Sequence, residues 1–87
     1  MPACVVVVGT LDTKGEEVAY LKQVIEQEGC STMVIDVGTL RPPTIFADIT
    51  RETVASAAGY TTEGLLRAND RRLSVEAMIQ GASIVVQ

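Results

Sequence analysis

The stretch Cys4-Val5-Val6-Val7-Val8-Gly9-Thr10-Leu11-Asp12-Thr13-Lys14-Gly15-Glu16 decides the fold. An unbroken Val run without polar alternation is typical of a strand covered on both faces, as in the parallel sheets of α/β proteins. The two glycines bound a turn, and Thr13 and Glu16 have the spacing of a capping box that opens a helix. The stretch therefore predicts a strand, a glycine-bounded loop and a helix N-terminus, where free amides and the helix dipole favour an anion.

The residues on either side of this loop predict a βαβ unit. The first strand is expected over 3–8, and an apolar stripe predicts a helix over 14–28 that Gly29 ends. That stripe consists of Val18, Leu21, Val24 and Ile25. A second β-branched run, over 32–37, predicts a strand parallel to the first and next to it.

The remainder of the chain is expected to form loop and helix. Residues 38–49 predict a long connection, which either crosses the surface or carries function. Helices are expected over 51–58, over 63–68 and from residue 70 onward. The capping candidates are Asp48, Thr50, Thr61, Thr62, Asn69 and Asp70. The last helix has as its candidate core contacts Leu73, Ala77, Met78, Ala82, Ile84 and Val85. Residues 83–87 are alternatively the start of a third strand.

The fold class is therefore α/β: a Rossmann-like βαβ unit with parallel strands plus additional C-terminal helices, as an incomplete three-layer sandwich. Two buried strands and several helices cannot close such a core alone. We expect residues 1–87 to be the N-terminal portion of a larger Rossmann-like domain. The missing C-terminal part of the same protein, or a homo-oligomer, would complete it.

Composition excludes several classes of function. The 87 residues carry a net charge of −4, and their seven Lys and Arg residues form no basic cluster, so nucleic acid is not an expected partner. No apolar run is long enough to span a bilayer, and no signal pattern is present, so we expect a cytoplasmic protein without a membrane partner. The absence of His excludes histidine-based catalysis and metal ligation within this chain.

Two cysteines, Cys4 and Cys30, are too few for a disulfide framework and lack the spacing of a zinc site. They are expected as free thiols near the starts of neighbouring strands, where they could lie close together. Their other interpretation is as small buried hydrophobic residues.

The candidate binding residues lie at the carboxyl ends of the two strands, where ligands of parallel sheets bind. They are Gly9, Thr10, Asp12, Thr13, Lys14, Gly15, Asp36 and Gly38. The loop is neither a Walker A motif nor GxGxxG, so phosphate binding and ordinary turn and capping duty both stay open.

In a phosphate site, the amides of 13–15 and the Lys14 ammonium would hold the anion, and Thr10 and Asp12 would orient it or hold magnesium. Asp36 lies where βαβ units place the acid that binds a ribose hydroxyl, although an Asp at a strand end is also a common turn residue. Caps or solvated helix charges are expected of Asp48, Arg51 and Glu52. The sequence Asp70-Arg71-Arg72 is expected to start a helix.

These motifs together resemble a known family, the Tm-1-like ATP-binding proteins, also called UPF0261. The resemblance covers essentially the whole chain. It rests on the segments Gly9-Thr10-Leu11-Asp12-Thr13-Lys14-Gly15-Glu16-Glu17, Tyr20-Leu21, Asp36-Val37-Gly38, Asp48-Ile49, Val54-Ala55, Ala57-Ala58-Gly59, Asp70-Arg71, Met78 and Gly81-Ala82. It implies a Rossmann-like domain that binds ATP, with the loop residues Thr10, Asp12, Thr13 and Lys14 at the nucleotide, in proteins longer than this chain.

Three hypotheses of function follow. The first is a nucleotide-binding module that holds ATP, with magnesium as a candidate companion ion. The second is a non-catalytic interaction or scaffold fragment that completes its sheet through self-association or through the remainder of the protein. The third is an enzyme, which would need Asp12, Lys14 and a metal; no catalytic residue is assigned, because the chain supplies no activated nucleophile.

Overall fold

The structure is a computed structural model that describes residues 3–86. Its elements, in chain order, are β1 (Cys4–Gly9), α1 (Gly15–Gln27), β2 (Ser31–Asp36), α2 (Arg51–Ala57), α3 (Thr62–Ala68) and α4 (Arg71–Val85). The two strands pair in parallel, in a register that runs from Cys4 opposite Ser31 to Gly9 opposite Asp36. The βαβ unit and the parallel strands expected from the sequence are therefore confirmed.

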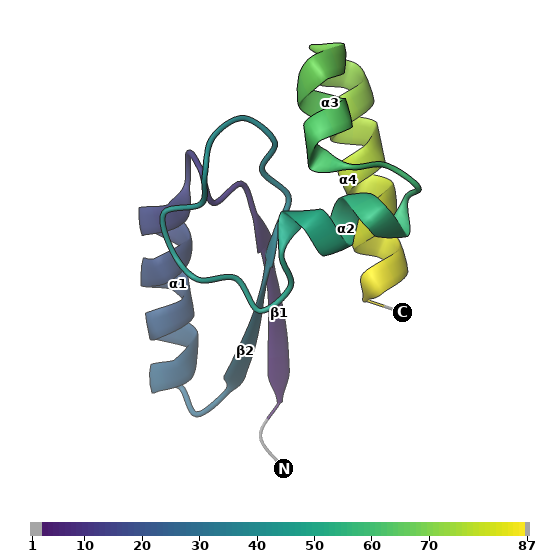
Figure 1. The fold of residues 1–87 in the computed structure, drawn as a ribbon. Coiled ribbons are helices and arrows are strands. Elements are labelled where there is room, and N and C mark those ends of the chain that lie inside the picture. The colour runs from purple at the N-terminus through teal and green to yellow at the C-terminus, as the bar shows by residue number, and fades with distance from the viewer. Residues whose placement is uncertain (1–2, 87) are drawn as a thin grey trace.

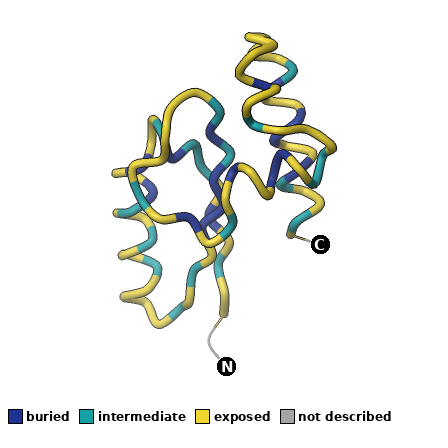
Figure 2. The backbone as a smooth tube through the Cα atoms, in the orientation of Figure 1, coloured by how far each residue is buried: buried dark blue, intermediate teal, exposed yellow. Residues whose placement is uncertain are grey.

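The helices cover opposite faces of the sheet (Figure 1). On one face, α1 packs through Val18 on Val7 and Val34. The other face carries α2, α3 and α4, where Ile35 meets Val54 of α2 and a cluster that also includes Leu65 and Met78. Side chains alternate between the faces of a strand, so each face has its own apolar cluster. The buried positions follow the sheet and the helix sides turned toward it (Figure 2).

Burial of the Val run on both faces was expected and is only partly observed. Val7 is 6% exposed, whereas Val6 is 44% and Val8 50% exposed. The two exposed valines lie on the face of α4, which does not cover them. In the α1 stripe, likewise, Leu21 and Val24 stay substantially exposed.

Three helix N-termini are capped by side chains that the sequence pointed to. Thr50, Thr61 and Asp70 accept hydrogen bonds from backbone amides in the first turns of α2, α3 and α4. The capping box expected at α1 is wrong. The N-cap residue of α1 is Lys14, and its side chain makes no capping hydrogen bond. The Thr13 hydroxyl instead forms a hydrogen bond with that of Thr10, 2.9 Å away.

The helix ends also follow the sequence. Gly29 and Gly59 have φ angles of 88° and 86°, which glycine adopts without strain, just after α1 and α2. The last helix, α4, extends to Val85, so the alternative of a third strand is wrong for the described residues; Gln87 lies outside them. Of its expected core contacts, Ala77 and Met78 are buried, whereas Ile84 is 42% exposed.

The connection of residues 38–49 forms no helix, and it packs against the β1–α1 turn and the outer edge of β2. The amide and hydroxyl of Thr44 both donate to the carbonyl of Leu11, at 3.0 and 2.9 Å. Ile49 forms a parallel bridge with Ile35. The connection therefore orders the carboxyl ends of both strands.

Two further expectations concern the thiols and membranes. Cys4 is exposed, Cys30 is partly buried, and both are free. No helix within residues 3–86 combines the length and apolar character needed to cross a membrane.

Candidate functional site

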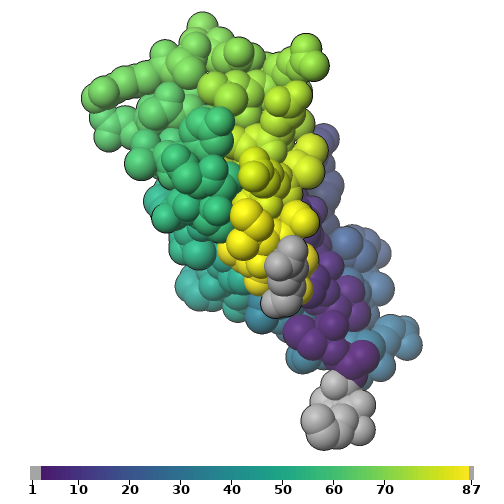
Figure 3. Space-filling model, turned by 90° about the vertical axis from the view of Figure 1, so that its right-hand side faces the viewer, coloured from purple at the N-terminus to yellow at the C-terminus, as the bar shows by residue number. Residues whose placement is uncertain are grey.

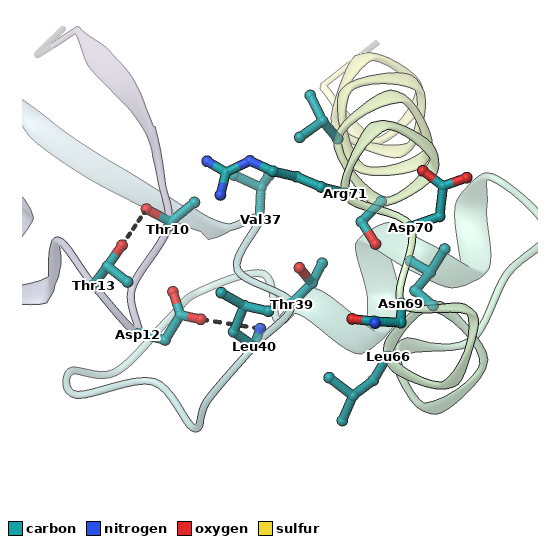
Figure 4. A pocket seen from close by; sticks show the side chains of 13 residues that line it. Thr10, Asp12, Thr13, Val37, Thr39, Leu40, Leu66, Asn69, Asp70 and Arg71 are labelled. Carbon is teal, nitrogen blue, oxygen red and sulfur yellow. Dashed lines mark hydrogen bonds between the residues drawn. The ribbon is translucent and has the colours of Figure 1, made fainter.

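A cavity of about 410 Å³ opens between the β1–α1 loop and the N-terminus of α4 (Figure 4). It lies at the carboxyl ends of the strands, where parallel sheets bind their ligands. Its lining is Thr10, Asp12, Thr13, Val37, Thr39, Leu40, Leu65, Leu66, Asn69, Asp70, Arg71, Ser74 and Val75. Hydroxyls, carboxylates, an amide and a guanidinium therefore surround an opening with apolar sides.

The cation of this cavity is Arg71, the first residue of α4. Its side chain extends across the opening toward Val37 and Thr10 (Figure 4). Among the described residues Arg71 forms no ion pair, whereas the neighbouring Arg72 pairs with Glu76 at 3.1 Å. From the sequence, Arg71 was expected only as part of a helix start, because no local pattern indicates that α4 brings it opposite the β1–α1 loop.

Asp12 is the anion of the β1–α1 loop. Its Oδ2 accepts hydrogen bonds from the amides of Leu40 and Arg41, at 3.1 and 3.0 Å. Burial raises the pKa of this carboxyl, but the two amides and the nearby charge of Arg51 together outweigh that effect. The pKa of Asp12 therefore lies below its ordinary value, and the group is ionised at neutral pH.

Asp36 lies behind the cavity wall in a buried ion pair. Its Oδ2 accepts from Nε of Arg51 at 2.8 Å, and its Oδ1 accepts from the amides of Leu11 and Gly38, at 3.2 and 2.8 Å. Asp36 is 1% and Arg51 7% exposed, so the expectation that Arg51 is a solvated helix charge is wrong. With both carboxylate oxygens engaged, Asp36 joins the loop, the turn after β2 and α2, and it does not face the opening.

The guanidinium of Arg51 has a second role in this arrangement. Its Nη1 donates to the carbonyl of Arg41, so it also anchors the connection whose amides bind Asp12. Within residues 3–86, its Nη2 is buried without a hydrogen-bond partner. Arg51 therefore positions Asp12 indirectly, from outside the cavity lining.

The three glycines of the expected site serve close packing. A Cβ at Gly9 would lie 2.8 Å from Cγ2 of Val18, and one at Gly15 would lie 1.8 Å from Oγ1 of Thr44. A Cβ at Gly38 would lie 2.8 Å from Oδ1 of Asp12. None of the three lines the cavity, and each allows a neighbouring segment to approach the backbone.

Lys14 also lies outside the cavity lining. Its ammonium pairs with Glu17 at 3.5 Å on the surface, where both side chains are mostly exposed. The structure thus brings Thr10, Asp12 and Thr13 together with Arg71, and it leaves Lys14 apart. An anion-binding role for Lys14 stays a prediction.

The residues described here offer few ligands for a metal ion. Within residues 3–86 no three His, Cys, Asp or Glu side chains group together as a metal site would need. Asp12 and Asp70 both line the cavity, but Asp70 already caps α4 by accepting from the amide of Leu73 at 3.1 Å. A magnesium ion that arrives with a nucleotide needs only one or two carboxylates in addition to phosphate oxygens. The carboxylates of the cavity therefore fit magnesium bound to a nucleotide, and they do not fit an ion held by protein side chains alone.

The fold and the cavity define an α/β domain built on a βαβ unit with a polar opening at its strand ends. A family model described as the N-terminal domain of an uncharacterised protein family, UPF0261, matches residues 3–87. The chain therefore belongs to the UPF0261 family, as the resemblance in its motifs implied.

Curated relatives share this assignment. A UPF0261 protein of Clostridium tetani is 39% identical over 83 residues, which cover 95% of this chain and 20% of that protein. The UPF0261 protein RA0729 of Rhizobium meliloti is 46% identical over 72 residues, covering 83% of this chain and 18% of its own length. The chain thus spans about a fifth of the length of these relatives. No solved structure matches it.

Proposed function

We propose that this chain is a nucleotide-binding module that holds the phosphates of ATP in the cavity between the β1–α1 loop and α4. The observation that carries the proposal is the position of Arg71, whose guanidinium has no ion-pair partner among residues 3–86 and extends across the opening toward Thr10. Guanidinium groups bind phosphate oxygens through two parallel hydrogen bonds. The hydroxyls of Thr10 and Thr13 bond to each other, which leaves one O–H of the pair to donate to a phosphate oxygen from the loop.

The N-terminus of α4 supports the same assignment. This helix of 15 residues begins at Arg71, and its first turn borders the cavity through Ser74. The positive end of its dipole adds to the charge of Arg71. A phosphate group between the loop and α4 would thus meet favourable electrostatics from α4 and a hydroxyl donor from the loop.

Two carboxylates in the lining decide the form of the ligand. Asp12 and Asp70 outnumber the single cation Arg71, so a bare triphosphate would be repelled. Magnesium bound to the phosphates removes much of this repulsion, and the ionised Asp12 is the side chain placed to approach the ion. ATP is therefore expected to bind as its magnesium complex. The proposal covers binding alone and does not include hydrolysis.

Thermal denaturation with and without Mg-ATP tests the proposal. At ten times the dissociation constant, binding stabilises the fold by about 1.4 kcal/mol, which raises Tm of a domain this size by about 6–11 °C. Magnesium alone and ATP with EDTA serve as ligand controls. We expect Arg71→Ala to lose most of the shift, and Arg72→Ala to keep it, because Arg72 points to Glu76.

Lys14→Ala separates the two assignments of the phosphate-binding cation. It is expected to keep the shift if Arg71 is the main contact, because Lys14 is outside the cavity lining. A Tm unchanged by millimolar Mg-ATP, or a shift that Arg71→Ala leaves intact, would contradict the proposal.

A further inference from the structure

The two edges of the sheet differ in whether another segment of the chain covers them. At the outer edge of β2, the amide of Val34 donates to Oδ2 of Asp48 at 2.7 Å. Ile49 continues this cover, since it donates to the carbonyl of Val34 and accepts from the amide of Asp36, both at 3.0 Å. No such segment pairs with the other side of β1, and β2 is its only strand neighbour in the described part of the chain.

The backbone amides and carbonyls that point to the free edge come from alternate residues of β1. The carbonyls of Ala3 and Gly9 accept from the amides of Ser31 and Val37, both at 2.9 Å, which turns the backbone of odd-numbered residues toward β2. In a parallel ladder the groups of the intervening residues point the other way. The amides and carbonyls of Val6 and Val8 therefore point outward, away from β2.

This edge lacks the features that protect exposed strands from pairing. β1 contains no charged residue and no proline, and its sequence is Cys-Val-Val-Val-Val-Gly. Native edge strands are usually blunted by Lys, by Pro, by a bulge or by a covering segment. β1 has the composition of an inner strand, and Val6 and Val8 are about half exposed.

An apolar groove of about 440 Å³ runs beside this edge, between β1 and α4. Its lining is Val8, Thr10, Val37, Val75, Met78, Ile79, Ala82, Ser83 and Val86. In the space-filling view β1 and α4 lie next to each other at the surface (Figure 3). α4 thus presents apolar side chains next to the uncovered strand.

The positions of the helices decide which strand would fill this space. α1 connects β1 to β2 on one face, whereas α4 follows β2 on the opposite face (Figure 1). Nearly all β-α-β crossovers are right-handed, and a crossover on the opposite face keeps that hand only by moving back across the sheet. A strand entered from α4 therefore lies beyond β1 and runs parallel to it, with its inward side chains under α4.

We propose that the free edge of β1 pairs with a third parallel strand, supplied in full-length members of the family by the segment that follows α4. The length of the relatives favours this occupant, because the chain matches only 20% of the Clostridium tetani protein. The strand order would be β2-β1-third strand, which makes β1 an inner strand and closes the apolar groove. It also places the cavity at the point where the strand order reverses, which is where open α/β sheets bind ligands.

Residue-level hydrogen exchange tests this pairing. The measurement compares the 87-residue chain with the full-length Clostridium tetani relative, at the positions that align with Val5 to Val8. In the short chain we expect Val5 and Val7 to be protected and Val6 and Val8 to exchange about 100-fold faster, because only the former bond to β2. In the full-length protein all four positions should be protected, at a level that does not change on dilution.

Two results would overturn the proposal. In the first, the full-length protein keeps the alternating pattern, which would mean that β1 is an edge strand there too. In the second, positions 6 and 8 are protected only in a dimer and lose protection on dilution, which would assign the edge to a second copy. If the short chain proves unfolded, the alternating or uniform pattern in the full-length protein decides the question by itself.

Discussion

Replacing Arg51 with Met is expected to destabilise the fold more than any change to a surface ion pair. The substitution keeps the aliphatic stem but leaves the carboxylate of Asp36, which is 1% exposed, buried without its cation. Breaking a buried pair from one side costs about 3–5 kcal/mol, because the remaining charge stays desolvated. The amides of Leu11 and Gly38 still donate to Asp36, so we expect the lower half of that range.

This loss is large relative to the total free energy of unfolding. A domain of this length has a free energy of unfolding of about 4–13 kcal/mol. Arg51→Met would therefore remove about a fifth or more of the free energy of unfolding, and it would lower Tm by about 12 °C or more. It would also release the carbonyl of Arg41, which loosens the connection that holds Asp12.

Urea denaturation followed by far-ultraviolet circular dichroism measures the effect. The matched control is Arg67→Met, which removes an ion pair to Glu63 whose side chains are 78% and 72% exposed. That change should cost less than about 1 kcal/mol. Equal losses in the two variants, or a loss below about 1 kcal/mol for Arg51→Met, would refute the assignment of a buried pair that supports the loop.

Other substitutions probe the packing, the loop and the β2 edge. Gly81→Ala should cost about 1–3 kcal/mol in urea unfolding, because a Cβ there would lie 2.0 Å from the carbonyl oxygen of Val54; a stabilised variant would contradict this packing. Because the folded pKa of Asp12 is depressed below 3.8, its contribution is present above pH 3.8 and is lost as pH falls through the folded value. Wild type should therefore lose more stability than Asp12→Asn between pH 6 and pH 3, and parallel curves would refute this. Asp48→Ala should lower the free energy of unfolding by about 1–3 kcal/mol, because it leaves the buried amide of Val34 without its acceptor. If hydrogen exchange becomes faster at that amide alone and the free energy of unfolding does not change, the effect is local and this prediction is contradicted.

Local patterns in the sequence were sufficient for most of the secondary structure. The Val run, the glycine-bounded loop and the second β-branched run predicted the parallel βαβ unit, and the capping residues Thr50, Thr61 and Asp70 marked three helix starts. These signals act within a few residues, so a linear sequence contains them in full. The capping box expected at Thr13 does not form, because the Thr13 hydroxyl bonds instead to that of Thr10 and the N-cap position of α1 is Lys14.

The site depended on contacts that are distant in sequence. Arg51 looked like an exposed charge on a short helix, yet it pairs with Asp36 because α2 packs against the end of β2. Arg71 is separated from Thr10 by most of the chain, and only the placement of α4 brings them to one cavity. Charged residues on helices are usually solvated, so no local signal identified either arginine as part of the strand-end architecture.

The central claim is that the cavity between the β1–α1 loop and α4 binds the magnesium complex of ATP. A titration of the ¹⁵N-labelled chain with Mg-ATP, followed by amide chemical shifts, tests it most directly. The account predicts saturable shifts at Thr10, Asp12 and Thr13 and at the start of α4, with no change near Gly29 at the far end of α1. Absence of shifts at millimolar Mg-ATP, or shifts confined to residues outside the cavity lining, would contradict it.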